Sequence, residues 1–186
     1  MDQGAPHIVP ESALPAASST IELAVHWTPD QVAAFPDLVP QLSPGRTPPS
    51  PTELQAILDD EGLHLLVARA PDRDIAGAIA LVFYRVPTGL HARIEDLVVS
   101  RDHRGQGLGK ALVQRAIQVG RQQHAHAIDL TPNPSRMEAN RLYLVLGFRD
   151  RETNVCGMVL DRPQGPAGSA WSPLPTHSSF LVSSEE

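Results

Sequence analysis

Between residues 20 and 161, segments with strand-like spacing of apolar residues alternate with segments of helix-like spacing. This alternation predicts a mixed α/β (α+β) domain. Short runs rich in apolar and β-branched residues have the character of strands, while longer segments repeat their apolar residues at helical spacing. Strands are expected at residues 21–27, 64–70, 75–85, 93–100, 127–131, 148–153 and 155–160. Helices are expected from Thr28 onward, over residues 52–60, over residues 108–122 and after Ser135.

The helix expected over residues 108–122 has the clearest pattern in the chain. Its apolar positions share one side: Leu108, Ala111, Leu112, Ala116 and Val119. Such a stripe predicts that the helix packs on a sheet. For the next helix, Ser135 and Glu138 have the spacing of a capping box, and Gly147 is expected to end it.

The two ends of the chain differ from the segment between them. Residues 1–19 and 162–186 are rich in Pro, Ala and Ser without periodicity. We therefore predict two disordered tails around one domain at residues 20–161.

Composition and charge narrow the function classes. A net charge of −6 argues against nucleic acid as a partner, because phosphate binding needs a basic surface. The longest apolar run, residues 78–83, is too short to span a bilayer, and Asp2 and Gln3 stand where a secretory signal would carry positive charge. With Cys156 as the single cysteine, no internal disulfide is possible and a reducing compartment fits. We predict a cytoplasmic protein that binds neither nucleic acid nor a membrane.

The run RGQGLG at residues 104–109 lies between an expected strand and the amphipathic helix. It contains three glycines: Gly105, Gly107 and Gly109. Glycine lets the backbone approach a ligand closely and turn so that successive N–H groups point at one anion. The positive end of the following helix favours the same charge. Three cations stand nearby, Arg101, Arg104 and the chain's only lysine, Lys110.

Two other phosphate-binding motifs are excluded by residue type. A Walker loop needs glycine, four residues and Gly-Lys-Ser/Thr, but Arg104 and Ala111 occupy the first and last of these positions. A dinucleotide fingerprint needs its third glycine three residues after its second, where this chain has Lys110.

The loop and a second motif together resemble the GNAT family of N-acetyltransferases. The family's signature loop is Gln or Arg, two residues, Gly, one residue, then Gly or Ala, and Arg104, Gly107 and Gly109 match it. The second motif consists of Asn133, Ala139, Asn140, Tyr143 and the LGF run at residues 146–148. The resemblance covers roughly residues 21–161 and is strongest over 93–153. It implies a central, mixed, mostly antiparallel twisted sheet of about six to seven strands, flanked by about four helices.

The resemblance also implies the donor substrate and its binding residues. In this family, loop amides bind the pyrophosphate of coenzyme A, and amides of the preceding strand pair with the pantetheine arm. Acetyl-CoA is therefore the expected cosubstrate. The residues expected to bind it are Leu97, Val98, Val99, Arg104, Gly105, Gln106, Gly107, Leu108, Gly109, Lys110, Asn133, Asn140 and Tyr143.

Acetyl transfer to an amine needs a base for the amine and an acid for the departing thiolate. Tyr143 matches the tyrosine that the family uses as the acid, and a packed core tyrosine is the alternative. Glu95 and Asp96 lie on the strand beside the cosubstrate, where only one of them can face the site unless a bulge intervenes. Glu95 is preferred because it shares a face with Leu97 and Val99 in an unbulged strand; Asp96 is the reserve. Both carboxylates could instead orient nearby arginines.

Neither a metal nor a covalent intermediate is expected. The eight histidines show no two-and-two ligand spacing. Cys156 lies in the apolar run VCGMVL, which predicts a small buried residue rather than an acyl-carrying nucleophile.

The leading hypothesis is an N-acetyltransferase that transfers the acetyl group of acetyl-CoA to a primary amine of a small molecule or peptide by direct attack in a ternary complex. An alternative is a catalytically weak acyl-CoA-binding regulatory or sensor module, and a longer acyl donor is a third possibility. The acceptor is expected to meet the Pro-rich residues 36–51, with Arg46 as their only cation, and the loop at residues 87–92. A monomer and a homodimer both fit the sequence.

Overall fold

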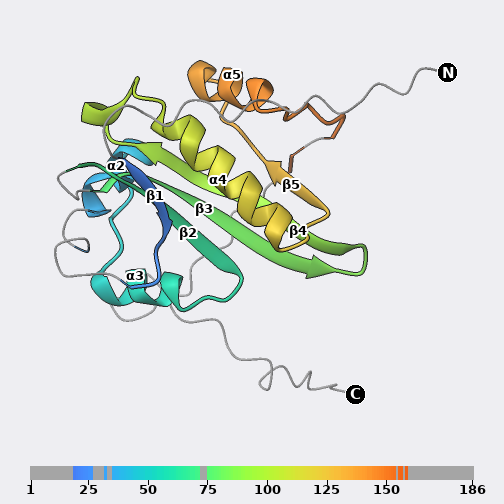
Figure 1. The fold of residues 1–186 in the computed structure, drawn as a ribbon, viewed down its shortest axis with the longest axis horizontal. Coiled ribbons are helices and arrows are strands. Elements are labelled where there is room, and N and C mark those ends of the chain that lie inside the picture. The colour runs from blue at the N-terminus through green and yellow to red at the C-terminus, as the bar shows by residue number, and fades with distance from the viewer. Residues whose placement is uncertain are drawn as a thin grey trace.

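The computed structural model describes residues 19–26, 32, 35–71, 75–153, 155–156 and 158. Within them, one sheet of five strands runs in the order β1-β2-β3-β4-β5 (Figure 1). The strands are β1 (Thr20–Leu23), β2 (Leu63–Arg69), β3 (Ile75–Val86), β4 (Gly89–Val99) and β5 (Ala127–Leu130). Neighbours are antiparallel except β4 and β5, which are parallel. The expected mixed, mostly antiparallel sheet is confirmed.

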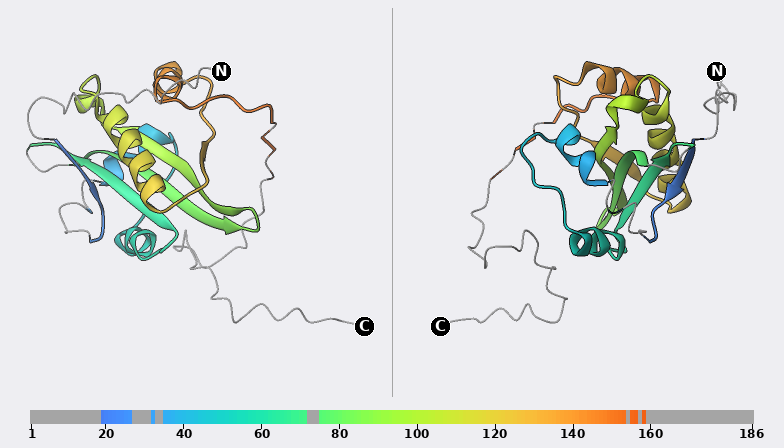
Figure 2. Two further views of the ribbon diagram at one scale, coloured as in Figure 1. Left: turned by 45° about the vertical axis from the view of Figure 1, so that its right-hand side comes forward. Right: turned by 90° about the vertical axis from the view of Figure 1, so that its left-hand side faces the viewer.

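Helices cover both faces of this sheet. The described residues contain α2 (Val39–Leu42), α3 (Pro51–Leu58), α4 (Leu108–Gln122) and α5 (Met137–Val145), with 3-10 turns η1 (Phe35–Asp37) and η2 (Arg101–His103). Figures 1 and 2 show α4 lying diagonally across one face with α5 on the same side, while α2 and α3 lie on the opposite face. The bounds of α4 are those predicted from its apolar stripe.

The central strands are apolar in consecutive positions because each face of the sheet has its own core. Leu66 and Ala68 of β2 belong to the cluster that includes Leu112 of α4. Leu65 and Val67, which alternate with them, belong to the cluster on the opposite face. A strand buried on both faces has a near-continuous apolar sequence, and this explains the pattern of β2 and β3.

Leu112 gives a direct test of the core under α4. Its side chain is fully buried, so Leu112→Ala removes apolar contacts and leaves a cavity. We expect the free energy of unfolding to fall by about 2–5 kcal/mol in a urea titration. Leu144→Ala on α5 is the matched control, because Leu144 is 59% exposed; it should change stability by no more than roughly 0.5 kcal/mol. Equal losses in the two variants would contradict the assigned core.

The helix starts differ from the predicted ones. Ser50 and Glu53 form a capping box at the start of α3. The predicted helix began at residue 52, two residues after Ser50. The capping box predicted for Ser135 with Glu138 is wrong: α5 starts at Met137, after an N-cap residue that makes no side-chain cap. The N–H and hydroxyl of Ser135 donate to Asn133 Oδ1 instead. Such a local turn competes with helix capping.

The sheet is also smaller than expected. Residues 148–153, predicted as a strand, have no strand structure, and residues 155, 156 and 158 lie outside any strand as well. The N–H of Phe148 donates back to the carbonyl of Tyr143, and Thr153 N–H donates to the Arg151 carbonyl, so backbone groups here make local bonds instead of ladder bonds. The predicted helix start at Thr28 and both predicted tails, apart from residue 19, lie outside the described residues.

Candidate active site between strands β4 and β5

The candidate site is the point at which β4 and β5 separate. The strands pair from His91 with Ala127 to Ile94 with Leu130, and the pairing stops there. A cleft of about 270 Å³ opens directly beyond the last pair. Its walls come from β4, the residues after β5, α2 and α5, and they consist of Leu42, Ser43, Ile94, Glu95, Asp96, Leu97, Leu130, Thr131, Pro132, Asn133, Arg136, Ala139 and Tyr143.

A β-bulge in β4 brings two adjacent carboxylates to this cleft. Ala78 of β3 pairs with Val98 and Ala80 pairs with Glu95, so β4 contains one extra residue in this interval. Asp96 takes up the irregularity with a φ of 53°, a left-handed conformation that is uncommon outside glycine. The condition on which Glu95 was preferred, an unbulged strand, is therefore not met. Glu95 and Asp96 both line the cleft, and alternation of side chains no longer favours Glu95.

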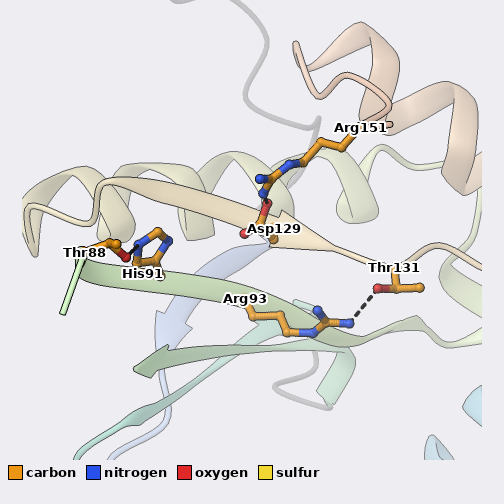
Figure 3. Close-up of polar contacts among 6 residues, drawn as sticks. All are labelled: Thr88, His91, Arg93, Asp129, Thr131 and Arg151. Atoms are coloured by element: carbon orange, nitrogen blue, oxygen red, sulfur yellow. Dashed lines mark hydrogen bonds and ion pairs between the residues drawn. The ribbon is translucent and has the colours of Figure 1, made fainter. Parts of the chain in front are cut away.

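Arg93 holds Glu95 and bridges the two diverging strands. Its Nε donates to Glu95 Oε1, and its Nη2 donates to Thr131 Oγ1 at 2.6 Å. Figure 3 shows the guanidinium of Arg93 extended from β4 toward Thr131, which follows β5. The side chains of Arg93 and Glu95 are 38% and 45% exposed, and pairs this exposed add little stability. The ion pair instead fixes where the carboxylate of Glu95 lies.

Further contacts fix β5 and the end of the hairpin between β3 and β4. Arg151 Nη1 lies 2.8 Å from Asp129 Oδ1, which attaches the segment after α5 to β5 (Figure 3). At the other end of β5, Thr88 Oγ1 lies 3.3 Å from His91 Nε2. Arg93 and Arg151 are not part of the cleft wall; both line a second, adjoining cavity.

The carboxyl of Asp96 has an altered pKa. The Asp96 side chain stays open to solvent on one side, yet desolvation by the nearby cleft walls raises the pKa of its carboxyl, and the neighbouring charge of Glu95 raises it further, while Arg136 and Arg46 act in the opposite direction. A carboxyl whose pKa is raised by folding binds its proton more tightly in the folded state. Its contribution to stability therefore falls as the pH rises from the unfolded pKa, about 3.9, through the folded one.

We expect Asp96→Asn to raise the melting temperature at pH 7, because it removes a partly desolvated charge and because Asn tolerates a left-handed φ. The advantage over the parent protein should shrink as the pH falls through the raised folded pKa of Asp96, and it should be lost below about 4, where the carboxyl is protonated in both the folded and unfolded states. Thermal melts of both proteins from pH 3 to pH 8 measure this. Asp102→Asn, at an exposed position of η2, is the control. A melting temperature for Asp96→Asn below that of the parent at pH 7 would contradict the assigned desolvation of Asp96.

Tyr143 closes the α5 side of the cleft. It is buried, and its ring packs edge-to-face on Phe148 with centroids 5.8 Å apart. Burial raises the pKa of its phenol, and the charge of Arg136 partly opposes this. The two interpretations of Tyr143 are compatible, since it belongs to the core cluster and also lines the cleft.

The glycine-rich loop leads into the N-terminus of α4. Gly105 and Gly107 have φ of 75° and 81°, and a Cβ built on either would meet no atom within 4 Å. Gly107 is the N-cap of α4 and makes no side-chain cap, so the first amides of the helix lack an intrahelical acceptor. Arg104 Nε donates to the carbonyl of Val99 at 3.1 Å and ties the loop to the end of β4. The loop can offer open amides to an anion.

Of the two asparagines of the second sequence motif, Asn133 lies between β5 and α5, and Asn140 lies in α5. Asn133 Oδ1 is engaged by Ser135, as described above, while Asn140 Nδ2 donates to the carbonyls of Asn133 and Pro134 at 3.2 and 3.4 Å. Asn140 Oδ1 is buried and has no partner within the described part of the chain. Asn140 lines the second cavity rather than the cleft.

Sequence reasoning missed several residues of this site. Arg136 lines the cleft, and nothing in its local sequence pointed there. Leu42 and Ser43, at the end of α2, also line the cleft and fall within residues 36–51, where the acceptor was expected. Arg93 does have a sequence signal: it stands two residues before Glu95, and residues at this spacing share one face of a strand.

A second cavity, of about 820 Å³, lies across β5 from the cleft and shares Leu130, Thr131, Pro132 and Tyr143 with it. Cys156 lines this cavity and is exposed, so the expectation that it is buried is wrong. It lies outside any strand, as do residues 155 and 158. Of the His, Cys, Asp and Glu side chains in the described ranges, no three come together as they would around a metal ion. No described helix combines the length and apolar character that a membrane crossing requires.

Comparison with known proteins agrees with the fold. The model of the acetyltransferase (GNAT) family matches residues 30–148, and the chain belongs to this family. Rat N-acetyltransferase 8B is 32% identical over 96 residues, which cover 51% of this chain and 43% of that protein. The chain thus aligns with less than half the length of this curated relative.

Solved structures show the same architecture. An acetyltransferase from Trypanosoma brucei is 26% identical, with a TM-score of 0.63 over 78% of this chain and 100% of that one. The structure of AAC(6')-Iy, in complex with a bisubstrate analogue containing CoA, is 18% identical, with a TM-score of 0.63 over 78% of this chain and 100% of that one. At this identity the second likeness concerns the fold alone.

Proposed function

We propose that this protein is an N-acetyltransferase that moves the acetyl group of acetyl-CoA to a primary amine of a small molecule or peptide. The observation that carries the proposal is the cleft at the divergence of β4 and β5, where two carboxylates and a tyrosine meet. Family membership supports acetyl-CoA as the donor.

The donor is expected to lie along the loop and the end of β4. Open amides at Gly105, Gly107 and the start of α4 suit a pyrophosphate, and Lys110 adds an exposed charge in the first turn. We assign pairing with the amides of the pantetheine arm to backbone groups of residues 97–99, as the family resemblance implies. The unpartnered Asn140 Oδ1 is a further acceptor for such an amide. We also propose that Arg104 and Asn133 take part in donor binding.

The transfer requires two proton movements at the cleft. The amine nitrogen forms a bond to the thioester carbonyl carbon as the carbon–sulfur bond breaks, and the electron pair leaves on sulfur. We assign protonation of this thiolate to Tyr143. An ordinary phenol has a pKa of about 10 and a thiol one of about 8.5, so a phenol stays protonated until the thiolate develops. The raised pKa of the Tyr143 phenol keeps it in the acid form at neutral pH.

Removal of the amine proton is assigned to the carboxylate pair at the bulge. A base is more effective when its pKa lies closer to the working pH, and the pKa of Asp96 is shifted in that direction. Glu95 is held by Arg93 and contributes negative charge that attracts a cationic amine. The bulge therefore makes Asp96 the stronger candidate base, and Glu95 the residue that orients the acceptor.

A thiol-release assay with acetyl-CoA and a panel of primary amines and peptides tests this function. Acetyl-CoA should bind in the absence of an amine, and thiol release should depend on adding one. Binding without turnover on any amine would instead support a regulatory or sensor module. Acetyl-CoA and longer acyl-CoA donors should be compared in the same assay.

A further inference from the structure

Arg136 links α2 and α5, which lie on opposite faces of the sheet and both contribute to the cleft wall. It immediately precedes α5 and lines the cleft. Its Nη2 donates to the carbonyl of Leu42, the last residue of α2, although the two are 94 positions apart in the chain. Because α2 and α5 lie on opposite sides of the sheet (Figure 2), this bond must reach across the gap between β4 and β5.

A second hydrogen bond attaches α2 to the other border of the cleft. Gln41 Oε1 accepts from the N–H of Arg101, directly after β4, at 3.0 Å. The helix α2 has only four residues, and so short a helix has little stability of its own. Its position therefore depends on Gln41, on the bond from Arg136 and on the buried side chain of Leu38.

The charge of Arg136 also acts on the groups inside the cleft. Its guanidinium lowers the pKa of the Asp96 carboxyl and of the Tyr143 phenol, in both cases against the effect of burial. Arg136 is thus close enough to both groups to influence them while it holds the carbonyl of Leu42.

We propose that Arg136 is a positioning residue that fixes α2 as the wall of the acceptor site. Leu42 and Ser43 line the cleft beside the two carboxylates, so a displaced α2 alters the space available to the acceptor. The glycine-rich loop is attached separately through Arg104. This inference rests on the proposed acetyl transfer for its kinetic consequence. Loss of Arg136 should raise the KM for the amine while leaving acetyl-CoA affinity nearly unchanged.

Hydrogen exchange and kinetics on three variants test this role. The backbone N–H groups of Gln41, Leu42 and Ser43 are bonded within or next to α2 and report its opening. In Arg136→Met we expect these amides to exchange about tenfold faster and the KM for the amine to rise by about the same factor, since a charge-assisted hydrogen bond is lost. Arg136→Lys keeps the charge and should restore part of both effects, and amides of β3 should be unchanged in all variants.

Arg141→Met is the matched control, because Arg141 is an exposed arginine of α5 that is not part of the cleft wall. Equal exchange of the α2 amides in Arg136→Met and Arg141→Met would overturn the inference. Faster α2 exchange in a protein that turns over no amine would refute the proposed reaction and still support Arg136 as the residue that holds α2.

Discussion

Replacement of Gly107 by Glu should abolish measurable acetyl-CoA binding. Gly107 has φ of 81° and is the N-cap of α4, so the substitution strains the backbone and places a negative charge at the positive end of the helix. Loss of the charge-assisted amide contacts together with the new repulsion should raise the Kd for acetyl-CoA by at least ~100-fold. Isothermal titration calorimetry with acetyl-CoA measures the change.

Gly45→Glu is the control that distinguishes loss of the anion site from the effect of backbone strain. Gly45 has φ of 82°, and a Cβ there also meets no atom within 4 Å, so both variants introduce the same strain and the same charge. Only Gly107→Glu should lose the donor. Unchanged acetyl-CoA affinity in Gly107→Glu, or an equal loss in both variants, would refute the assignment of the loop.

Replacement of Tyr143 by Phe should lower kcat by about 10²–10⁴-fold, the usual contribution of a positioned general acid. The ring packing on Phe148 is kept, so stability and the Kd for acetyl-CoA should change little. Steady-state kinetics with the best acceptor of the amine panel, alongside calorimetry, would separate these effects.

The chain's other tyrosine, Tyr84, provides the control. It is 39% exposed and stacks on His91, away from the residues of the cleft wall. Tyr84→Phe should retain the parent kcat. If Tyr143→Phe also retains it, Tyr143 is a packing residue and the acid must be another group.

The sequence predicted the elements in which one strong local signal dominates. The apolar stripe of α4 and the apolar runs of β2 and β3 gave the correct elements, because burial against a neighbour dictates those residues. The strand predicted at residues 148–153 was wrong for the opposite reason. These residues contain Phe148 but are otherwise mostly charged, and the single aromatic side chain packs on Tyr143 without any need for a ladder.

The parts of the site that depend on local sequence could be predicted, and the parts that depend on tertiary structure could not. The loop at residues 104–109 has its signal in its own glycines. The bulge at Asp96 depends on the register of β4 against β3, which no short motif encodes. Arg136 reaches α2 only because the fold brings two distant helices to one cleft.

The central claim is direct transfer from acetyl-CoA to an amine, and initial velocities over a grid of donor and acceptor concentrations test it most directly. Transfer within a ternary complex predicts that thiol release requires the amine and that the double-reciprocal lines intersect. Parallel lines, or a burst of thiol without amine, would show an acyl-enzyme intermediate and contradict the account.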